Sequence, residues 1–181
     1  MENINDVVER VLVSEEEIRA CVKKMAEEIS KDYKGKCPLF VSALSGSYVF
    51  TADLMRELTI EGQVAFIFVS SYDTGTVSSG TVEITSGKGF DPVGRDIIIL
   101  EDIIDSGRTL NKLRQYLVDQ GAASVEICTL LDKPSRRVVD VDVKYCGFQI
   151  PDEFVIGYGL DFGYKYRQFP FVGVLKREYY E

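Results

Sequence analysis

The sequence predicts one α/β domain with a mostly parallel, twisted sheet flanked by helices. Short apolar runs rich in β-branched residues alternate with segments whose apolar residues recur at helical spacing. The 181 residues have the length of one domain, and the sequence shows neither an internal repeat nor a linker between domains.

The first predicted helix begins at Ser14, because the series Ser-Glu-Glu-Glu has the form of a capping box. Apolar residues follow at helical spacing as far as Ile29, and Gly35 marks the end of the segment. The next expected elements are a buried strand over 39–44, a helix over 48–58, a strand over 64–69, and, after a Ser-, Thr- and Gly-rich connection over 70–80, a strand over 81–84.

The second half of the chain continues this alternation. Residues 96–100 form an apolar, β-branched run that is typical of a strand in a parallel sheet. A helix is predicted over 109–120, since its leucines share one face and Gly121 follows. The remaining strands are expected over 124–131, 143–148, 154–158 and 171–175.

Two properties of the whole chain narrow its function. The formal net charge is -8, whereas a protein whose main task is to coat nucleic acid needs a basic field. The chain contains no histidine, which excludes His-based triads, His-ligated zinc and histidine general bases. Acid–base chemistry must therefore come from Asp, Glu, Lys, Tyr or a metal-bound group.

We expect a cytoplasmic protein that does not enter a membrane. No apolar run approaches the length of a membrane span, and the N-terminal sequence is acidic, unlike a secretory signal. The cysteines lack a CxxC spacing, which favours buried, reduced thiols over a disulfide framework or a metal site. They are Cys21, Cys37, Cys128 and Cys146.

The segment over 97–110 carries the strongest chemical signal. An apolar strand is expected to end in two carboxylates, Glu101 and Asp102, and a small polar turn then leads into a helix. Ligands of parallel sheets bind at this edge. The acids can hold a ribose diol, and the turn over 105–109 can bind phosphate because Gly107 permits close approach. The pattern indicates a phosphorylated sugar; a magnesium site of the receiver or NTPase type and a solvated acid pair are the alternatives.

At these residues the chain resembles the type I phosphoribosyltransferases, and Glu-Asp-Ile-Ile-Asp-Ser-Gly over 101–107 resembles their hypoxanthine-guanine branch. The likeness runs from about residue 14 to 176. Further motifs lie in the order of that branch at Ser70-Ser71-Tyr72 and over 128–134, 147–152 and 155–161. The resemblance implies the type I fold in one domain. Its expected core spans about 36–160, and the terminal segments, about 1–35 and 161–181, form a small hood.

The resemblance also implies an activity: transfer of the phosphoribosyl group from phosphoribosyl pyrophosphate to hypoxanthine or guanine, with Mg²⁺ as cofactor. Asp105 is implied as the general base near purine N7, a role that needs no histidine. Its structural alternative is to cap the following helix. The residues implied to bind phosphoribosyl pyrophosphate are Ser45, Gly46, Glu101, Asp102, Asp105, Ser106, Gly107, Arg108, Thr109 and Arg167.

The purine-binding residues implied by the resemblance are Lys133, Phe154, Val155 and Asp161. Lys133 would contact the 6-oxo group and select against adenine, and Phe154 would stack on the purine. Without the resemblance, Lys133 would be interpreted as a surface residue, and Phe154 and Val155 as strand core. Mg²⁺ is assigned to Asp161, Glu101 and Asp102.

Two loops complete the expected site. Ser45 and Gly46 fall on the pyrophosphate loop of the family, which has a cis peptide bond, here between Leu44 and Ser45. Many relatives carry lysine in place of Ser45, so a direct charge on pyrophosphate is missing here. Ser71 and Tyr72 are assigned to a lid over the reacting centre; an ordinary loop is the alternative.

The resemblance implies a homodimer or homotetramer and leaves three competing functions. An RNA-binding regulator on the same fold would need a basic face, against which the acidic net charge argues. A transferase for another base, such as uracil or adenine, is disfavoured by the motifs around Lys133 and Phe154. A receiver-like magnesium site without transferase activity leaves the lid and Asp161 segments unexplained.

Overall fold

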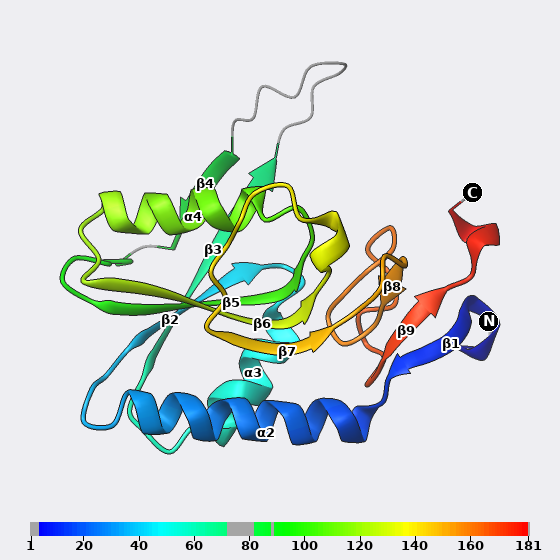
Figure 1. Cartoon of the computed structure of the whole chain (residues 1–181), viewed down its shortest axis with the longest axis horizontal. Helices are drawn as coiled ribbons and strands as arrows, with labels where there is room; N and C mark the ends of the chain where they lie inside the picture. The colour runs from blue at the N-terminus through cyan, green and yellow to red at the C-terminus, as the bar shows by residue number, and fades with distance from the viewer. Residues whose placement is uncertain (1–3, 72–81, 88, 181) are drawn as a thin grey trace.

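A computed structural model of the chain describes residues 4–71, 82–87 and 89–180, which form a six-stranded and a three-stranded sheet (Figure 1). In spatial order the larger sheet contains β4 (Val82–Ser86), β3 (Gln63–Ser71), β2 (Leu39–Leu44), β5 (Asp96–Ile104), β6 (Ser124–Asp132) and β7 (Tyr145–Gln149). Only the β3–β4 pair of this sheet is antiparallel among the described strands. The predicted α/β fold with a mostly parallel sheet is confirmed.

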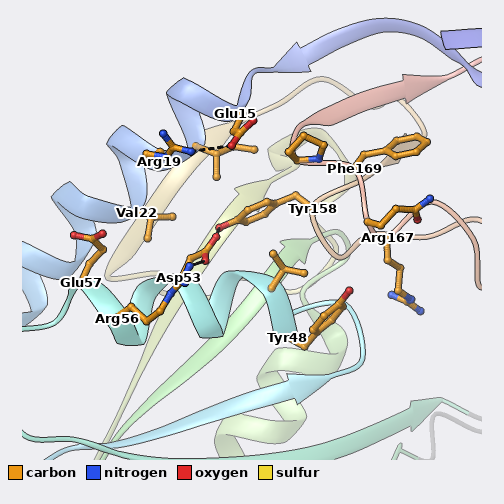
Figure 2. Close-up of a pocket in the computed structure, with 14 residues that line it drawn as sticks. Glu15, Arg19, Val22, Tyr48, Asp53, Arg56, Glu57, Tyr158, Arg167 and Phe169 are labelled. Carbon is orange, nitrogen blue, oxygen red and sulfur yellow. Dashed lines mark hydrogen bonds and ion pairs between the residues drawn. The ribbon is translucent and has the colours of Figure 1, made fainter. Parts of the chain in front are cut away.

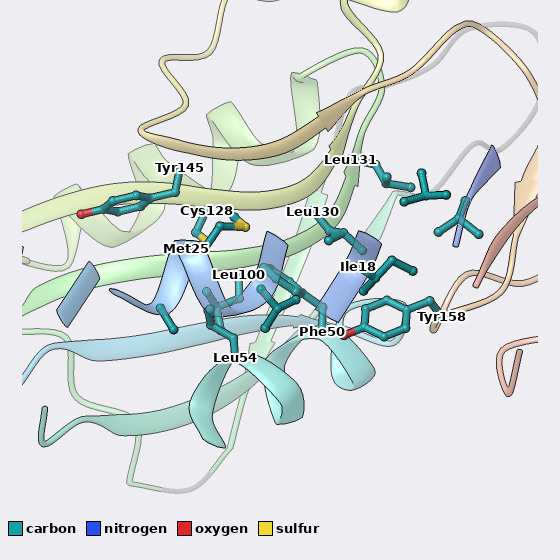
Figure 3. Packing of buried hydrophobic residues seen from close by; sticks show 14 of the residues in the cluster. Ile18, Met25, Phe50, Leu54, Leu100, Cys128, Leu130, Leu131, Tyr145 and Tyr158 are labelled. Carbon is teal, nitrogen blue, oxygen red and sulfur yellow. The ribbon is translucent and has the colours of Figure 1, made fainter. Parts of the chain in front are cut away.

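Helices cover both faces of the larger sheet. The helices α2 (Glu15–Asp32) and α3 (Tyr48–Glu57) lie on one face, and α4 (Arg108–Asp119) lies on the other (Figure 1). Neighbouring residues of β5 show this division: Leu100 packs with α2 and α3, whereas Ile99 packs with α4. Figure 3 shows the core between α2, α3 and the sheet, in which Ile18, Phe50 and Tyr158 meet.

The predicted capping box at the start of α2 is present. Ser14 Oγ accepts a hydrogen bond from the Glu17 backbone N–H at 3.3 Å, and Glu17 Oε2 accepts one from the Ser14 N–H at 2.8 Å. Such a cap stabilises a helix by about 1 kcal/mol. It fixes the start of α2, directly after the strand β1 (Val8–Val13), which the sequence analysis did not predict.

The strand β5 is longer than expected. It continues through both acids to Ile104, in parallel register with β6, and the turn begins at Asp105. The reason is that Ile104 is buried beside α4, so burial of this side chain keeps the segment in the sheet. The helix α4 then begins after Gly107, whose φ of +78° is in the left-handed region; an added Cβ would lie 2.5 Å from the Val139 carbonyl oxygen.

The smaller sheet has the order β1-β9-β8, with β9 at Val172–Leu175 and β8 at Val155–Ile156. Both of its strand pairs are antiparallel. The strand expected over 154–158 is shorter because Gly157, Tyr158 and Gly159 all have positive φ. The remaining described elements are α1 (Ile4–Val7), η1 (Pro134–Arg136) and η2 (Arg177–Tyr179).

Strands from both terminal segments form this smaller sheet, as a hood requires, and the expected division into core and hood stays a prediction. The helix α2, placed in the hood, packs against α3 and the larger sheet because its apolar face is buried there. Conversely β8, placed in the core, pairs only with β9 among the described strands. Both sheets nevertheless contribute to one apolar cluster, in which Val13 and Val174 join Phe40 and Phe50.

Two further expectations concern cysteines and membranes. The four cysteines are free thiols, and Cys128 is buried as predicted. Cys37 and Cys146 are exposed instead, Cys146 because β7 is an edge strand of the larger sheet. Among the helices of the described chain, not one combines the length and the apolar character needed to cross a membrane.

Candidate functional site

The predicted general base and all four purine-binding residues line one cavity of about 590 Å³. Asp105 follows β5 and Lys133 follows β6, both at the carboxyl edge of the larger sheet. Phe154, Val155 and Asp161 approach from the side of the smaller sheet. The cavity therefore lies between the two sheets, and its other lining residues are Glu9, Ile103, Arg136, Asp152, Glu153, Leu160, Val174, Arg177 and Tyr180.

Asp105 and Lys133 form an ion pair in the lining of this cavity. Lys133 Nζ lies 3.5 Å from Asp105 Oδ1; the Lys133 side chain is 8% exposed and that of Asp105 is 50% exposed. The alternative interpretation, in which Lys133 is an ordinary surface residue, therefore does not hold. Nor does Asp105 cap α4, whose N-cap is Gly107 without a side-chain hydrogen bond. Its carboxylate is therefore available to a ligand.

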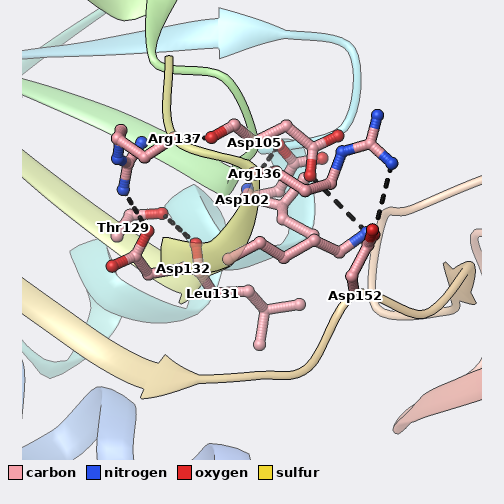
Figure 4. Close-up of polar contacts among 10 residues, drawn as sticks. Asp102, Asp105, Thr129, Leu131, Asp132, Arg136, Arg137 and Asp152 are labelled. Atoms are coloured by element: carbon pink, nitrogen blue, oxygen red, sulfur yellow. Dashed lines mark hydrogen bonds and ion pairs between the residues drawn. The ribbon is translucent and has the colours of Figure 1, made fainter. Parts of the chain in front are cut away.

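Arg137, which the sequence analysis missed, holds the backbone of this pair. Its guanidinium donates to the main-chain carbonyl of Asp105 at 3.3 Å and pairs with the carboxylate of Asp132 (Figure 4). The Lys133 backbone N–H donates to the Ile104 carbonyl at 2.9 Å. No local pattern in the sequence identifies Arg137, because its contacts depend on the fold of η1 against the β5–α4 turn.

A smaller cavity of about 130 Å³ lies at the N-terminus of α4. It is lined by Glu101, Ile103, Ile104, Asp105, Ser106, Gly107, Thr109 and Leu110. The first backbone N–H groups of a helix have no partner within the helix, so this end attracts an anion such as phosphate. The predicted phosphate turn is thus assembled, except that the exposed Arg108 lines neither this cavity nor the larger one.

The pyrophosphate loop packs directly against Asp102 and Gly159. Its Leu44–Ser45 peptide bond is cis, as the resemblance implies. A Cβ on Gly46 would lie 1.6 Å from Asp102 Oδ2, and one on Gly159 would lie 2.1 Å from the Gly46 carbonyl oxygen. Both positions therefore require glycine. Below the loop, the buried hydroxyls of Ser42, Ser47 and Thr51 form a hydrogen-bonded chain at 2.8 Å that was not predicted.

Arg167 places a positive charge at the loop. Its guanidinium donates to the Gly159 carbonyl at 2.6 Å and to Ser45 Oγ at 3.2 Å, and it pairs with Asp161 Oδ1 at 2.8 Å. A guanidinium thus lies beside Ser45, whose own side chain is uncharged. Asp161 is fixed from its other side, since Oδ2 accepts a hydrogen bond from the Tyr164 N–H.

Glu101 and Asp102 form an acidic pair, in which Asp102 is buried and Glu101 is partly buried. Asp102 Oδ1 accepts a hydrogen bond from the Ile103 N–H at 2.9 Å, whereas Glu101 Oε2 is buried without a hydrogen-bond partner in the described part of the chain. Burial, and next the charge of Asp102, raise the pKa of the Glu101 carboxyl; burial also raises the pKa of Asp102. Hydroxyl groups or a cation would satisfy this pair.

The three predicted magnesium ligands do not converge on one point. Over residues 4–71, 82–87 and 89–180, no three Asp, Glu, Cys or His side chains are grouped closely enough to hold a metal ion. Asp161 Oδ1 pairs with Arg167 at 2.8 Å instead. The unpartnered oxygen of Glu101 fits a Mg²⁺ ion only if substrate oxygens supply most of its ligands.

The predicted lid is only partly visible. Ser71 ends β3, where its backbone pairs with Val82 of β4. Tyr72 lies outside the described residues. The assignment of this pair to a lid stays a prediction.

A third cavity, of about 380 Å³, lies behind the pyrophosphate loop between α2, α3 and the segment over 158–170 (Figure 2). In it the Tyr158 hydroxyl donates to Asp53 Oδ2 at 2.6 Å. Burial, and next this hydrogen bond, raise the pKa of Tyr158. The cavity shares Arg167 with the site but contains neither Asp105 nor a purine-binding residue, so it is not the reacting centre.

Comparison with known proteins agrees with this arrangement. The chain matches the family described as phosphoribosyl transferase domain over residues 12–163. The hypoxanthine-guanine phosphoribosyltransferase of Streptococcus pneumoniae is 47% identical over 97% of each chain; that of Lactococcus lactis is 48% identical over 98% of this chain and 97% of the relative. A hypoxanthine phosphoribosyltransferase structure from Staphylococcus aureus has a TM-score of 0.94 at 41% identity, covering 100% of this chain and 99% of that one.

Proposed function

This chain belongs to the phosphoribosyltransferase family, in its hypoxanthine-guanine branch, and from this premise we propose that it makes purine nucleotides. It would transfer the 5-phosphoribosyl group of phosphoribosyl pyrophosphate to hypoxanthine or guanine, giving IMP or GMP and pyrophosphate. One observation carries the proposal: the Asp105–Lys133 pair, Phe154 and Val155 share a cavity beside the phosphate turn of α4.

The Asp105–Lys133 pair matches one edge of a 6-oxopurine. N7 and O6 lie next to each other on that edge. A donor and an acceptor 3.5 Å apart can therefore bind O6 and a protonated N7 together, Lys133 donating and Asp105 accepting. Adenine would present an amino group to the ammonium of Lys133, so two donors would oppose each other. This arrangement supports a preference for hypoxanthine and guanine.

The reaction is a displacement at the anomeric carbon of ribose. The bond from this carbon to the pyrophosphate oxygen breaks, a bond to purine N9 forms, and the proton on N7 passes to Asp105. The helix start at Gly107 would hold the 5-phosphate, and Arg167 with the loop at Ser45 and Gly46 would hold the leaving pyrophosphate. Phe154 would stack on the base, so that the reactants are aligned before the bond forms.

Mg²⁺, when bound, would neutralise charge on the leaving pyrophosphate. The residues that would hold it are Asp161, Glu101 and Asp102, together with oxygens of the substrate, which would supply most of the ligands. The unpartnered Glu101 oxygen supports this role. Ser71 and Tyr72 would close over the reacting centre and exclude water.

The test is a base panel with phosphoribosyl pyrophosphate and Mg²⁺. Hypoxanthine, guanine, xanthine, adenine and uracil are offered in separate reactions, and nucleotide formation is followed by chromatography. Product from hypoxanthine or guanine, lost on adding a chelator, is the expected result. Product from adenine or uracil alone would instead assign another base. No product from any base, together with retention of structured RNA in a filter-binding assay, would support the regulatory alternative.

We also propose that the protein works in the cytoplasm as a homodimer or homotetramer. Three apolar residues on one face of β3 are exposed: Val64, Phe66 and Phe68 are 43%, 45% and 57% exposed, whereas Ile67, which points to the other face, is buried. Such an exposed apolar surface supports self-association. Light scattering coupled to size-exclusion chromatography would give the mass. A mass of one chain would contradict the proposed assembly.

A further inference from the structure

Tyr180, next to the last residue of the given sequence, is stacked on Phe154. The two ring centroids lie 5.2 Å apart with an interplanar angle of 26°. Both residues are 39% exposed, and both line the 590 Å³ cavity that contains Lys133 and Asp105. Nothing in the local sequence around Tyr180 indicates a contact with a residue 26 positions earlier.

The backbone around Tyr180 is well tied to the smaller sheet. The Leu175 N–H donates to the Phe154 carbonyl at 2.8 Å, which joins β9 to the segment before β8. The Lys176 N–H donates to the Val7 carbonyl, and the Tyr180 N–H closes the turn of η2 onto the Arg177 carbonyl, both at 3.0 Å. These main-chain hydrogen bonds fix the backbone of Tyr180 and thereby place its ring beside Phe154.

Phe154 has one further ring contact among the described residues. The ring of Phe162 meets it edge to face, with centroids 5.6 Å apart and an angle of 90°. Lys133 and Asp105 come from the larger sheet, whereas Tyr180 follows the last strand of the smaller sheet. Tyr180 thus reaches Phe154 from the side of the smaller sheet, whereas Lys133 belongs to the larger sheet.

We propose that Tyr180 is a positioning residue for the purine: it fixes the ring plane of Phe154, on whose other face the base stacks. This inference rests on the proposed function of the cavity. A half-exposed phenylalanine has several accessible rotamers, and a stacked partner selects one of them before the base binds. Aromatic stacking of this kind corresponds to a change of about 3- to 10-fold in a binding constant.

The test compares Tyr180→Ala, Tyr180→Phe and Phe154→Ala in steady-state kinetics. Tyr180→Ala is expected to raise KM for hypoxanthine about 3- to 10-fold. KM for phosphoribosyl pyrophosphate and kcat at saturating base should stay within about 2-fold of wild type. Tyr180→Phe, which keeps the ring, should restore the wild-type KM for hypoxanthine. A general loss of folding would change all three parameters and would not be rescued by phenylalanine.

Two outcomes would overturn the inference. An unchanged KM for hypoxanthine in Tyr180→Ala would remove the positioning role, and a lower KM would show that the tyrosine ring occupies the place of the base. If Phe154→Ala raises this KM while Tyr180→Ala does not, only the inference fails. If the wild-type protein does not use hypoxanthine, the proposed function itself fails.

A binding measurement gives a second test that does not depend on turnover. The chain contains no tryptophan, so Tyr180→Trp introduces a single indole at the stacked position. Titration with IMP is expected to change its emission and to saturate near the inhibition constant of IMP for the same variant. Emission that stays constant while IMP inhibits the variant would contradict the proposal.

Discussion

Asp105 is held at two different atoms by two different cations. Lys133 Nζ lies 3.5 Å from its carboxylate, and Arg137 donates to its main-chain carbonyl at 3.3 Å. The backbone contact fixes the residue without using the carboxylate, which stays half exposed toward the cavity. A general base needs this combination, because the proton acceptor must be correctly placed and still accessible to the substrate.

Replacement of Asp105 by Asn should remove the proton acceptor and preserve the shape of the side chain. We expect kcat to fall about 10²- to 10⁴-fold, the usual contribution of a positioned base. The KM for phosphoribosyl pyrophosphate should change little, since the phosphate turn of α4 is retained. Steady-state kinetics in both substrates checks this. A kcat within a few-fold of wild type would exclude the general-base role.

Lys133 should govern the choice of base. The variant Lys133→Met keeps an unbranched side chain of similar length but removes the ammonium and leaves Asp105 without its ion-pair partner. We expect kcat/KM for hypoxanthine to fall about 10- to 100-fold, the range for losing a hydrogen bond to a charged group. Activity with adenine should fall less. An unchanged ratio of kcat/KM between hypoxanthine and adenine would contradict the assignment of Lys133.

At the scale of elements, the site depends on two loops that touch backbone to backbone. The pyrophosphate loop lies against the side chain of Asp102 within β5 and against Gly159 after β8. Arg167 joins the same two loops by its contacts with Ser45 and the Gly159 carbonyl. Residues that follow strands of both sheets therefore set the position of the pyrophosphate loop. A displacement of the loop at Gly159 should displace the pyrophosphate loop as well.

Gly46→Ala tests this contact. The added methyl group would lie 1.6 Å from Asp102 Oδ2, so either the loop or Asp102 must move. We expect KM for phosphoribosyl pyrophosphate to rise at least 10-fold and the melting temperature to fall, because Asp102 is buried and cannot move freely. Gly87→Ala is the matched control, since a Cβ added there would meet no atom of the described residues within 4 Å, its chain neighbours aside. Equal effects of the two substitutions would contradict the packing argument.

The sequence predicts the elements whose burial pattern is regular and misses those that depend on distant segments. The helix α2 and the strand β2 follow from apolar periodicity and a capping box. The strand β1 was missed because Glu9 and Arg10 interrupt its apolar residues, and it is held by pairing with β9 at the other end of the chain. The acids of β5 suggested a strand end, although the buried Ile104 extends the strand beyond them.

The same distinction holds for the site. The motifs that follow β5 and β6 indicated Asp105 and Lys133, since parallel strands bring their carboxyl ends to one edge. Arg137 and Tyr180 were not indicated, because each acts on a residue that the fold alone brings near. The assignment of Mg²⁺ to Glu101, Asp102 and Asp161 stays a prediction, since these carboxylates do not form one protein-made site among the described residues.

At the scale of the whole molecule, the two sheets share one apolar core. Val155 and Val174 of the smaller sheet belong to the same buried cluster as Phe40 of the larger sheet and Leu54 of α3. Because the 590 Å³ cavity is lined from both sheets, this shared core sets the distance between Phe154 and Lys133. A protein built in this way should unfold as one unit rather than losing the smaller sheet first.

Tyr158 lies within this shared core, so its replacement tests whether both sheets unfold together. Its ring is buried with Phe50, and its hydroxyl donates to Asp53 of α3 at 2.6 Å (Figure 2). Tyr158→Phe keeps the ring and removes the hydrogen bond, so the free energy of unfolding should fall by about 0.5–1.5 kcal/mol, or somewhat more because the acceptor is a carboxylate. Denaturant unfolding followed by far-ultraviolet circular dichroism and by tyrosine fluorescence should give coincident curves for both proteins, shifted together in the variant. Separate transitions in either protein would mean that the smaller sheet unfolds independently, and the cavity between the sheets could then open without loss of the larger one.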